Sequence, residues 1–114
     1  MPAVDDNDAL FVSDMSSNFM SRPVDWTRYA AVWAGVQKNF GTAGLACVIV
    51  RRDQLGCTAE TVPQMLDWSV YARNNSLQNT PPVLQFYTAM LMARWVDEQG
   101  GVAEMDRRAK ERSA

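Results

Sequence analysis

The sequence predicts an α/β fold in which three mainly buried strands are followed by helices, and three observations lead to this prediction. Apolar runs of strand length lie in the first half of the chain, at residues 9–13, 29–36 and 45–52. They lack the alternation of apolar and polar residues that marks a sheet with one wet face, so both faces should be covered. The second half carries helix signals, the strongest over Val83–Glu98.

Length and composition limit the chain to one domain and remove several functional classes. Its 114 residues are 47% hydrophobic and 21% charged, close to the average for globular proteins. Eleven basic residues against 13 acidic ones provide no basic surface for nucleic acid. The sequence contains no histidine. The commonest metal ligand and general base are therefore missing, and we expect no metal site.

Three features of the sequence predict the cellular location of the protein. The longest apolar runs have about eight residues, far fewer than the roughly 20 that cross a bilayer, so no membrane association is expected. The first eight residues hold three aspartates and no basic residue, unlike a signal peptide. Two cysteines, Cys47 and Cys57, form no disulfide framework and fit a reducing compartment. These features predict a cytoplasmic protein.

The three strands follow from their flanking residues. The first run, residues 9–13, ends in a polar cluster that begins with Asp14, as expected for a strand followed by a loop. Pro23 restricts the backbone before the second run, residues 29–36. A short link containing glycine leads from there to the β-branched third run, residues 45–52. This link predicts an antiparallel second pair, and we expect the first two strands to be parallel.

The signals after the third strand are helical. Residues 61–75 carry a weak apolar stripe that predicts one short helix. Thr80 before two prolines is typical of a capped helix start, and Gly100 with Gly101 marks a stop, so Val83–Glu98 is predicted as a helix. Apolar residues surround most of it, and it therefore needs protein on several sides. Residues 102–112 predict a final, charged and solvated helix.

The predicted elements are too few to bury their own apolar surfaces in a complete domain. Strands covered on both faces and a helix that is apolar all round need more cover than one weak helix and one polar helix provide. We therefore expect the chain to be part of a larger domain and to associate or aggregate when isolated. The alternative is a small three-stranded domain that dimerises through an apolar surface.

One lysine and one aspartate are candidates for chemistry. Lys38 follows the second strand and would lie at its carboxyl edge, where desolvation favours the neutral amine that forms Schiff bases. Asp14 ends the first strand, and open α/β sheets bind ligands beyond the carboxyl ends of their strands. If the strands are parallel, the amine and the carboxylate share one edge, as pyridoxal phosphate needs. The alternatives are a solvated loop lysine and an aspartate that stabilises a turn.

A second candidate group lies at the start of the long helix. Asn79, Thr80 and the free backbone N–H groups there are able to hold a phosphate, although Pro81 and Pro82 remove two of those donors. Simple capping by Thr80 explains the same residues. Cys57 has no base near it in the sequence and is given no catalytic role.

Six short segments carry a family resemblance. They are residues 13–18 (SDMSSN), 21–23 (SRP), 34–39 (AGVQKN) with Gly41 and Gly44, 48–51 (VIVR), 79–82 (NTPP) and 100–105 (GGVAEM). Together, in this order, they resemble the phosphoserine aminotransferases, which are fold-type I enzymes dependent on pyridoxal phosphate. The resemblance covers nearly the whole chain. It implies that residues 1–114 are a middle fragment of the large domain of such a transferase.

The resemblance also implies a role for each candidate residue. Lys38 would form the internal aldimine with pyridoxal phosphate, Asp14 would pair with the pyridine nitrogen, and Gln37 would contact the cofactor phosphate. Asn79 and Thr80 would reach across a homodimer interface to the phosphate of the partner's cofactor. The active site would then be shared between two subunits.

The implied reaction moves an amino group from glutamate to 3-phosphohydroxypyruvate and gives phosphoserine on the route to serine, and related members serve pyridoxine synthesis. The chain corresponds to roughly a third of the length that such two-domain enzymes need. We expect it to be inactive or nearly so by itself, because the segments that clamp the substrate lie outside it. Two alternatives stay open, namely another fold-type I aminotransferase and a non-catalytic assembly protein that keeps the dimer surface.

Overall fold

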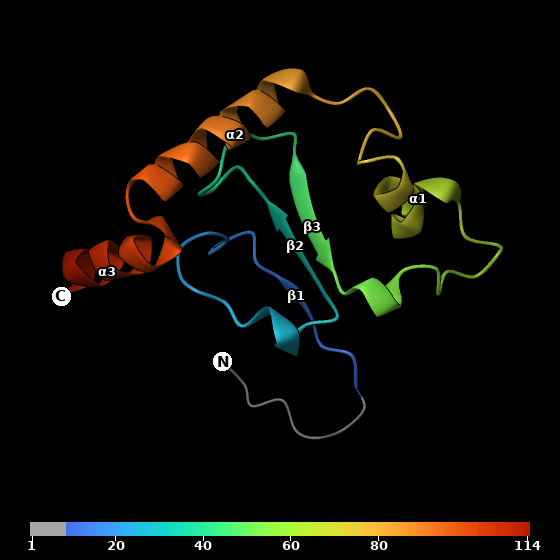
Figure 1. Ribbon diagram of the computed structural model, residues 1–114, viewed down its shortest axis with the longest axis horizontal. Coiled ribbons are helices and arrows are strands. Elements are labelled where there is room, and N and C mark those ends of the chain that lie inside the picture. Colours follow the sequence, from blue (N-terminus) through green and yellow to red (C-terminus); the bar gives the residue numbers. More distant parts are fainter. Residues whose placement is uncertain (1–8) are drawn as a thin grey trace.

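The computed structural model describes residues 9–114, in which three strands precede three α-helices (Figure 1). The strands are β1 (Val12–Asp14), β2 (Ala31–Gly35) and β3 (Ala46–Val50). The α-helices are α1 (Trp68–Arg73), α2 (Val83–Glu98) and α3 (Gly101–Ser113). Short 3-10 turns occupy Trp26–Arg28, Arg52–Gln54 and Gln64–Leu66. The predicted α/β class is confirmed.

The strands form one mixed sheet in the order β1-β2-β3. β1 is parallel to β2, with Asp14 opposite Trp33. β2 is antiparallel to β3, with Gly35 opposite Ala46. Both predicted orientations are confirmed. The parallel pair places the carboxyl ends of β1 and β2 at the same edge of the sheet, so the loops that follow the two strands start side by side.

β2 is the buried centre of the sheet. Its residues Val32 and Ala34 are 1% and 0% exposed. They form a core cluster with three aromatic and sulfur-containing side chains, those of Met15, Phe19 and Tyr29. The expectation that all three strands are mainly buried is met by β2 and is wrong for β1 and β3 within this chain. Val12, Val48 and Ile49 stay exposed, because no helix of residues 9–114 packs closely over them.

The long helix has the predicted limits but a different start. α2 runs over Val83–Glu98, with Pro82 as its N-cap and no side chain bonded to its free amides. The predicted capping by Thr80 is therefore wrong. Pro81 and Pro82 separate Thr80 from the first turn, so its hydroxyl lies too far back to reach the N–H groups of that turn. No helix in the described part of the chain is long and apolar enough to cross a membrane.

The surface of α2 is unusually apolar. Its buried residues are Ala89 and Val96. Seven large apolar side chains of the helix are exposed: Val83, Leu84, Phe86, Tyr87, Met90, Leu91 and Trp95. This agrees with the expectation that α2 needs protein on several sides.

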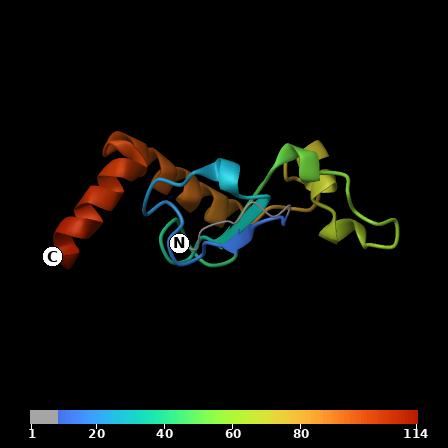
Figure 2. The same cartoon turned by 90° about the horizontal axis from the view of Figure 1, so that it is seen from below.

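The molecule is thin for its length. Its extents are 50 × 41 × 19 Å and its radius of gyration is 16.0 Å. A compact chain of this length has a radius of gyration of about 13 Å. Figure 2 shows the flat arrangement, with α3 at one end and the α1 region at the other. The assignment of residues 1–114 to part of a larger transferase domain stays a prediction.

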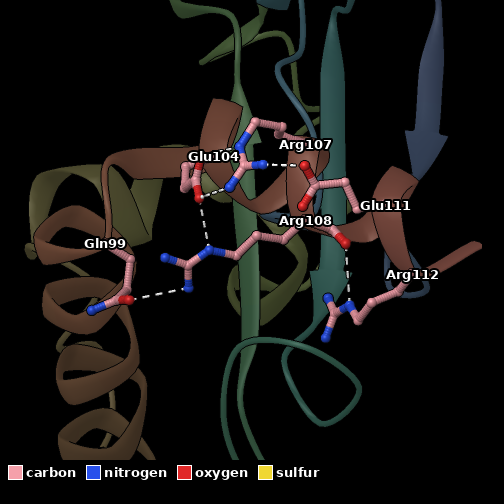
Figure 3. A network of polar contacts seen from close by, with 6 residues as sticks. All are labelled: Gln99, Glu104, Arg107, Arg108, Glu111 and Arg112. Atoms are coloured by element: carbon pink, nitrogen blue, oxygen red, sulfur yellow. Dashed lines mark hydrogen bonds and ion pairs between the residues drawn. The ribbon is translucent and has the colours of Figure 1, made fainter.

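Two glycines turn the chain from α2 into α3. Gly100 and Gly101 have φ angles of 103° and 78°. A residue with a Cβ would be strained at these angles. Arg108 of α3 spans the corner, donating to Gln99 Oε1 at 3.0 Å and to Glu104 Oε1 at 2.8 Å (Figure 3). We call α2 and α3 together, residues 83–113, the helical arm.

Candidate functional site

Asp14 ends β1, and the loop that follows holds its carboxylate. Asp14 Oδ1 accepts a hydrogen bond from the Ser16 N–H at 2.8 Å and another from the Ser16 hydroxyl at 2.6 Å. The Ser16 oxygen accepts in turn from the N–H of Gly35, in β2, at 2.8 Å. The carboxylate is thereby tied to the neighbouring strand and does not rotate freely. The alternative interpretation, an aspartate that stabilises a turn, also describes these bonds.

The same contacts keep Asp14 ionised. Its pKa lies below the usual value, first because of the Ser16 hydroxyl and then because of the Ser16 N–H. Desolvation raises the pKa by less than either Ser16 bond lowers it, and the Trp33 side chain and the positive charge of Lys38 add still smaller lowering effects. An ionised carboxylate is the state that holds a proton on a pyridine nitrogen, so Asp14 fits that role.

Lys38 lies at this same edge, in the turn after β2. Its Nζ donates a hydrogen bond to Ser17 Oγ at 3.0 Å. Ser16 and Ser17 are neighbours, so one loop contacts both the carboxylate and the amine. The structure therefore brings Asp14 and Lys38 to one edge, as parallel pairing of β1 and β2 requires. Their roles toward a cofactor stay predictions.

Gln37 lies two residues after Gly35, the last residue of β2, which leaves space for its side chain. A Cβ at Gly35 would lie 2.5 Å from Gln37 Oε1, so the glycine leaves room for the Gln37 amide to fold back over the strand. Gln37 is exposed, as are Asp14 and Lys38. All three predicted residues of the sheet edge are thus accessible to a ligand.

The two loops of this edge brace each other. The Asn39 side-chain amide donates to the Phe19 carbonyl at 2.8 Å. The rings of Phe19 and Phe40 pack edge to face with their centroids 5.4 Å apart. The turn is closed by the Phe40 and Gly41 N–H groups, which both bond to the Val36 carbonyl at 2.9 Å. Packing and backbone bonds therefore fix the positions from which Asp14 and Lys38 project.

Asn79 and Thr80 do not join this group within one chain. They precede α2, and Asn79 lines a hollow of about 550 Å³ between β3, α1 and the start of α2. Trp68 and Phe86 are among the other lining residues, whereas Asp14 is not. Within residues 9–114, no recorded contact links Asn79 or Thr80 to the Asp14 and Lys38 pair.

Sequence reasoning did not give Ser16 and Ser17 a part in the site. The available signal was local: a serine two residues after an aspartate is typical of a side-chain turn. The important contacts are not local, because Ser16 meets Gly35 across 19 residues and Ser17 meets Lys38 across 21. Only the pairing of β1 with β2 brings them together.

Comparison with known sequences identifies the family. Residues 2–114 match the aminotransferase class-V family model. A phosphoserine aminotransferase of Bacteroides thetaiotaomicron is 45% identical over 102 residues, which make up 90% of this chain and 29% of that protein. One from Bacteroides fragilis is 44% identical over 108 residues, covering 95% of this chain and 30% of that protein. The chain thus spans about 30% of the length of these curated relatives.

Solved structures agree on the fold. The pyridoxal-phosphate-bound phosphoserine aminotransferase of Trichomonas vaginalis matches with a TM-score of 0.87 and 40% identity, over 97% of this chain and 32% of that one. The enzyme from Bacillus circulans subsp. alkalophilus matches with a TM-score of 0.87 and 37% identity, over 93% of this chain and 29% of that one. Because the family model covers nearly the whole sequence, the chain belongs to the aminotransferase class-V family.

Proposed function

We propose that this chain is the segment of a phosphoserine aminotransferase that supplies the lysine and the aspartate of a pyridoxal phosphate site. The complete enzyme would move the amino group of glutamate to 3-phosphohydroxypyruvate, giving phosphoserine and 2-oxoglutarate. The observation that carries the proposal is the common edge of Asp14 and Lys38, held by adjacent residues of one loop. Two relatives that are 44–45% identical bear this enzyme name, which supports the substrate class.

The residues at the sheet edge fit the cofactor. Pyridoxal phosphate, when bound, serves as the sink for the electrons released at the substrate carbon. Lys38 Nζ would hold the aldehyde carbon and then take and return a proton. Asp14 would keep a proton on the ring nitrogen, for which its lowered pKa suits it. Gln37, exposed beside them, would donate from its amide to the phosphate.

Asn79 and Thr80 would complete the site of a second subunit. Both residues are exposed at the start of α2 and, in the part of the chain that the structure describes, have no recorded contact with the Asp14 and Lys38 pair. The exposed apolar surface of α2 begins directly after them, and a two-fold partner would cover such a surface. A homodimer with shared sites is therefore part of the proposal.

Turnover would require more protein than these residues provide. The chain spans about 30% of the length of its curated relatives. The 114 residues are proposed to hold the cofactor aldehyde without completing amino transfer, since positioned substrate groups supply much of the rate. The cytoplasmic location inferred from composition stays a prediction.

Covalent trapping tests the cofactor role, and the sequence offers a matched control. The chain has two lysines, Lys38 and Lys110. Pyridoxal phosphate is added to the 114-residue chain, the product is reduced with borohydride, and mass spectrometry locates the label. We expect the label on Lys38, its loss in Lys38→Ala and its retention in Lys110→Ala. Equal labelling of the two lysines, or none on a folded sample, would refute the proposal.

A non-catalytic assembly function is the second candidate. The exposed apolar side chains of α2 favour it, because a surface of this kind is typical of association. It predicts self-association of the 114-residue chain without any label on Lys38. Sedimentation of the chain before and after addition of pyridoxal phosphate separates the two candidates.

A further inference from the structure

We propose that Ser16 is a positioning residue, which fixes the Asp14 carboxylate relative to Lys38 by linking it to the backbone of β2. This inference rests on the proposed function. The link consists of two hydrogen bonds in series, from the Gly35 N–H to Ser16 Oγ at 2.8 Å and from the Ser16 hydroxyl to Asp14 Oδ1 at 2.6 Å. One hydroxyl thus joins the carboxylate to the strand that leads directly into Gln37 and Lys38.

The Ser16 hydroxyl takes the place of a strand carbonyl. The Met15 N–H still bonds to the Trp33 carbonyl at 2.8 Å, after which the segment following β1 leaves the sheet. The Gly35 N–H lies beyond this point and is paired by Ser16 Oγ. Since an unpaired backbone N–H is costly, the serine both satisfies the strand and aligns the carboxylate.

Two other aspartates show that a turn of this kind need not make such a link. Asp25 Oδ1 accepts from the Thr27 N–H at 3.1 Å and from its hydroxyl at 2.6 Å. Asp67 accepts from the Ser69 N–H at 2.9 Å and from its hydroxyl at 2.8 Å. Both aspartates are N-caps, of a 3-10 turn and of α1 respectively.

The turn at Asp14 begins no regular helix. The Ser16 hydroxyl accepts from a strand amide 19 residues away, beside a lysine whose charge acts on the same carboxylate. The Ser69 hydroxyl also accepts a hydrogen bond, but from Arg73 of the same helix, α1. Capping therefore explains the turns at Asp25 and Asp67 but not the turn at Asp14. Positioning of the carboxylate next to Lys38 accounts for the additional bond.

The first test measures the carboxylate without any cofactor. The Asp14 side-chain carbon is titrated by NMR in the 114-residue chain and in Ser16→Ala. We expect the pKa of Asp14 to rise toward its ordinary value in Ser16→Ala. Thr27→Val is the matched control, because it should raise the pKa of Asp25 and leave that of Asp14 as in the parent chain.

A second variant covers the possibility that Ser16→Ala does not fold. Ser16→Thr keeps the hydroxyl, and the Asp14 titration should match that of the parent chain. An unchanged Asp14 pKa in folded Ser16→Ala, or a shift in Ser16→Thr as large as in Ser16→Ala, would overturn the role of Ser16.

The last experiment adds the cofactor. Ser16→Ala should bind pyridoxal phosphate roughly tenfold more weakly than the parent chain, the size expected for losing a hydrogen bond to a charged group. Thr27→Val should bind it equally well. Failure of the parent chain to bind would count against the proposed function alone, since the NMR titration decides the role of Ser16 independently. Equal binding by folded Ser16→Ala and the parent chain would overturn the positioning role.

Discussion

Two polar networks on this chain are built in opposite ways. At the sheet edge, Ser16 connects Asp14 to a backbone N–H that β2 holds in place. On the helical arm, Glu104 pairs with Arg107 and Arg108, which are side chains of the same helix with substantial exposure (Figure 3). The comparison teaches that a hydrogen bond fixes the position of a side chain when the partner group is itself held rigidly. A charged partner on a mobile side chain does not fix the position by its charge alone.

The largest difference between the two regions should appear in their packing. Val36 is 1% exposed and directly precedes Gln37, whereas Val83 of the arm is 71% exposed. Val36→Ala should lower the free energy of unfolding by about 2 kcal/mol, because it leaves a gap in the core. Val83→Ala should change it by less than about 0.5 kcal/mol. Urea denaturation measures both, and equal losses would remove the contrast.

A smaller effect is expected at the corner of the arm. Gly100 has a φ of 103°, and a Cβ there raises the energy of the backbone. Gly100→Ala should therefore destabilise the corner by about 1 kcal/mol. Amide hydrogen exchange should become faster in α3 and stay unchanged in β2. Acceleration spread evenly over both elements would mean that the arm and the sheet unfold as one unit.

Acid should act on the arm before it disturbs the core. Hydrogen bonds from Arg107 and then Arg108 lower the pKa of Glu104 from 4.5 to about 2. Because the folded pKa is the lower one, this stabilisation is complete above pH 4.5 and is lost as the pH falls toward about 2. Circular dichroism should show loss of helix in that window. Glu104→Gln lacks the pairing at every pH and should weaken the transition.

Salt should have the smallest effect. At 1 M salt the screening length is about 3 Å, so the exposed pairs of Arg107 with Glu104 and Glu111 should loosen. The bonds from Gly35 through Ser16 to Asp14 end on a backbone group and should persist. NMR shifts of the Arg107 Nε and Gly35 amide signals compare the two directly. A larger response at Gly35 would reverse the proposed contrast.

The sequence was sufficient to locate elements whose boundaries are set by local chemistry. α2 has the predicted limits because Pro82 and Gly100 bound it. Burial was harder to predict, since β2 and β3 are both apolar but only β2 is mostly buried. An apolar side chain is expected to be buried, but which element packs against it depends on segments elsewhere in the protein.

The residues of the candidate site also differ in how far local sequence patterns could predict them. The common edge of Asp14 and Lys38 could be predicted because strand ends can be read from neighbouring residues. Ser16 was not found, because its bond to Gly35 exists only after β1 pairs with β2. Thr80 was assigned a cap that the two intervening prolines prevent. Local patterns thus gave the candidate chemistry, whereas distant pairing decided which hydroxyl supports it.

The mixed sheet has a consequence for the order in which the chain folds. β3 follows β2 through residues 36–45 and returns antiparallel, whereas β1 must wait for residues 15–30 to close a longer loop before its parallel pairing forms. Longer closure costs more chain entropy, so we expect the hairpin to form early and β1 to dock late. Pulsed hydrogen exchange would then protect the N–H of Ile49, which faces β2, before that of Ser13. In this order the hairpin at the centre of the sheet forms first, and the edge that brings Asp14 beside Lys38 is completed last.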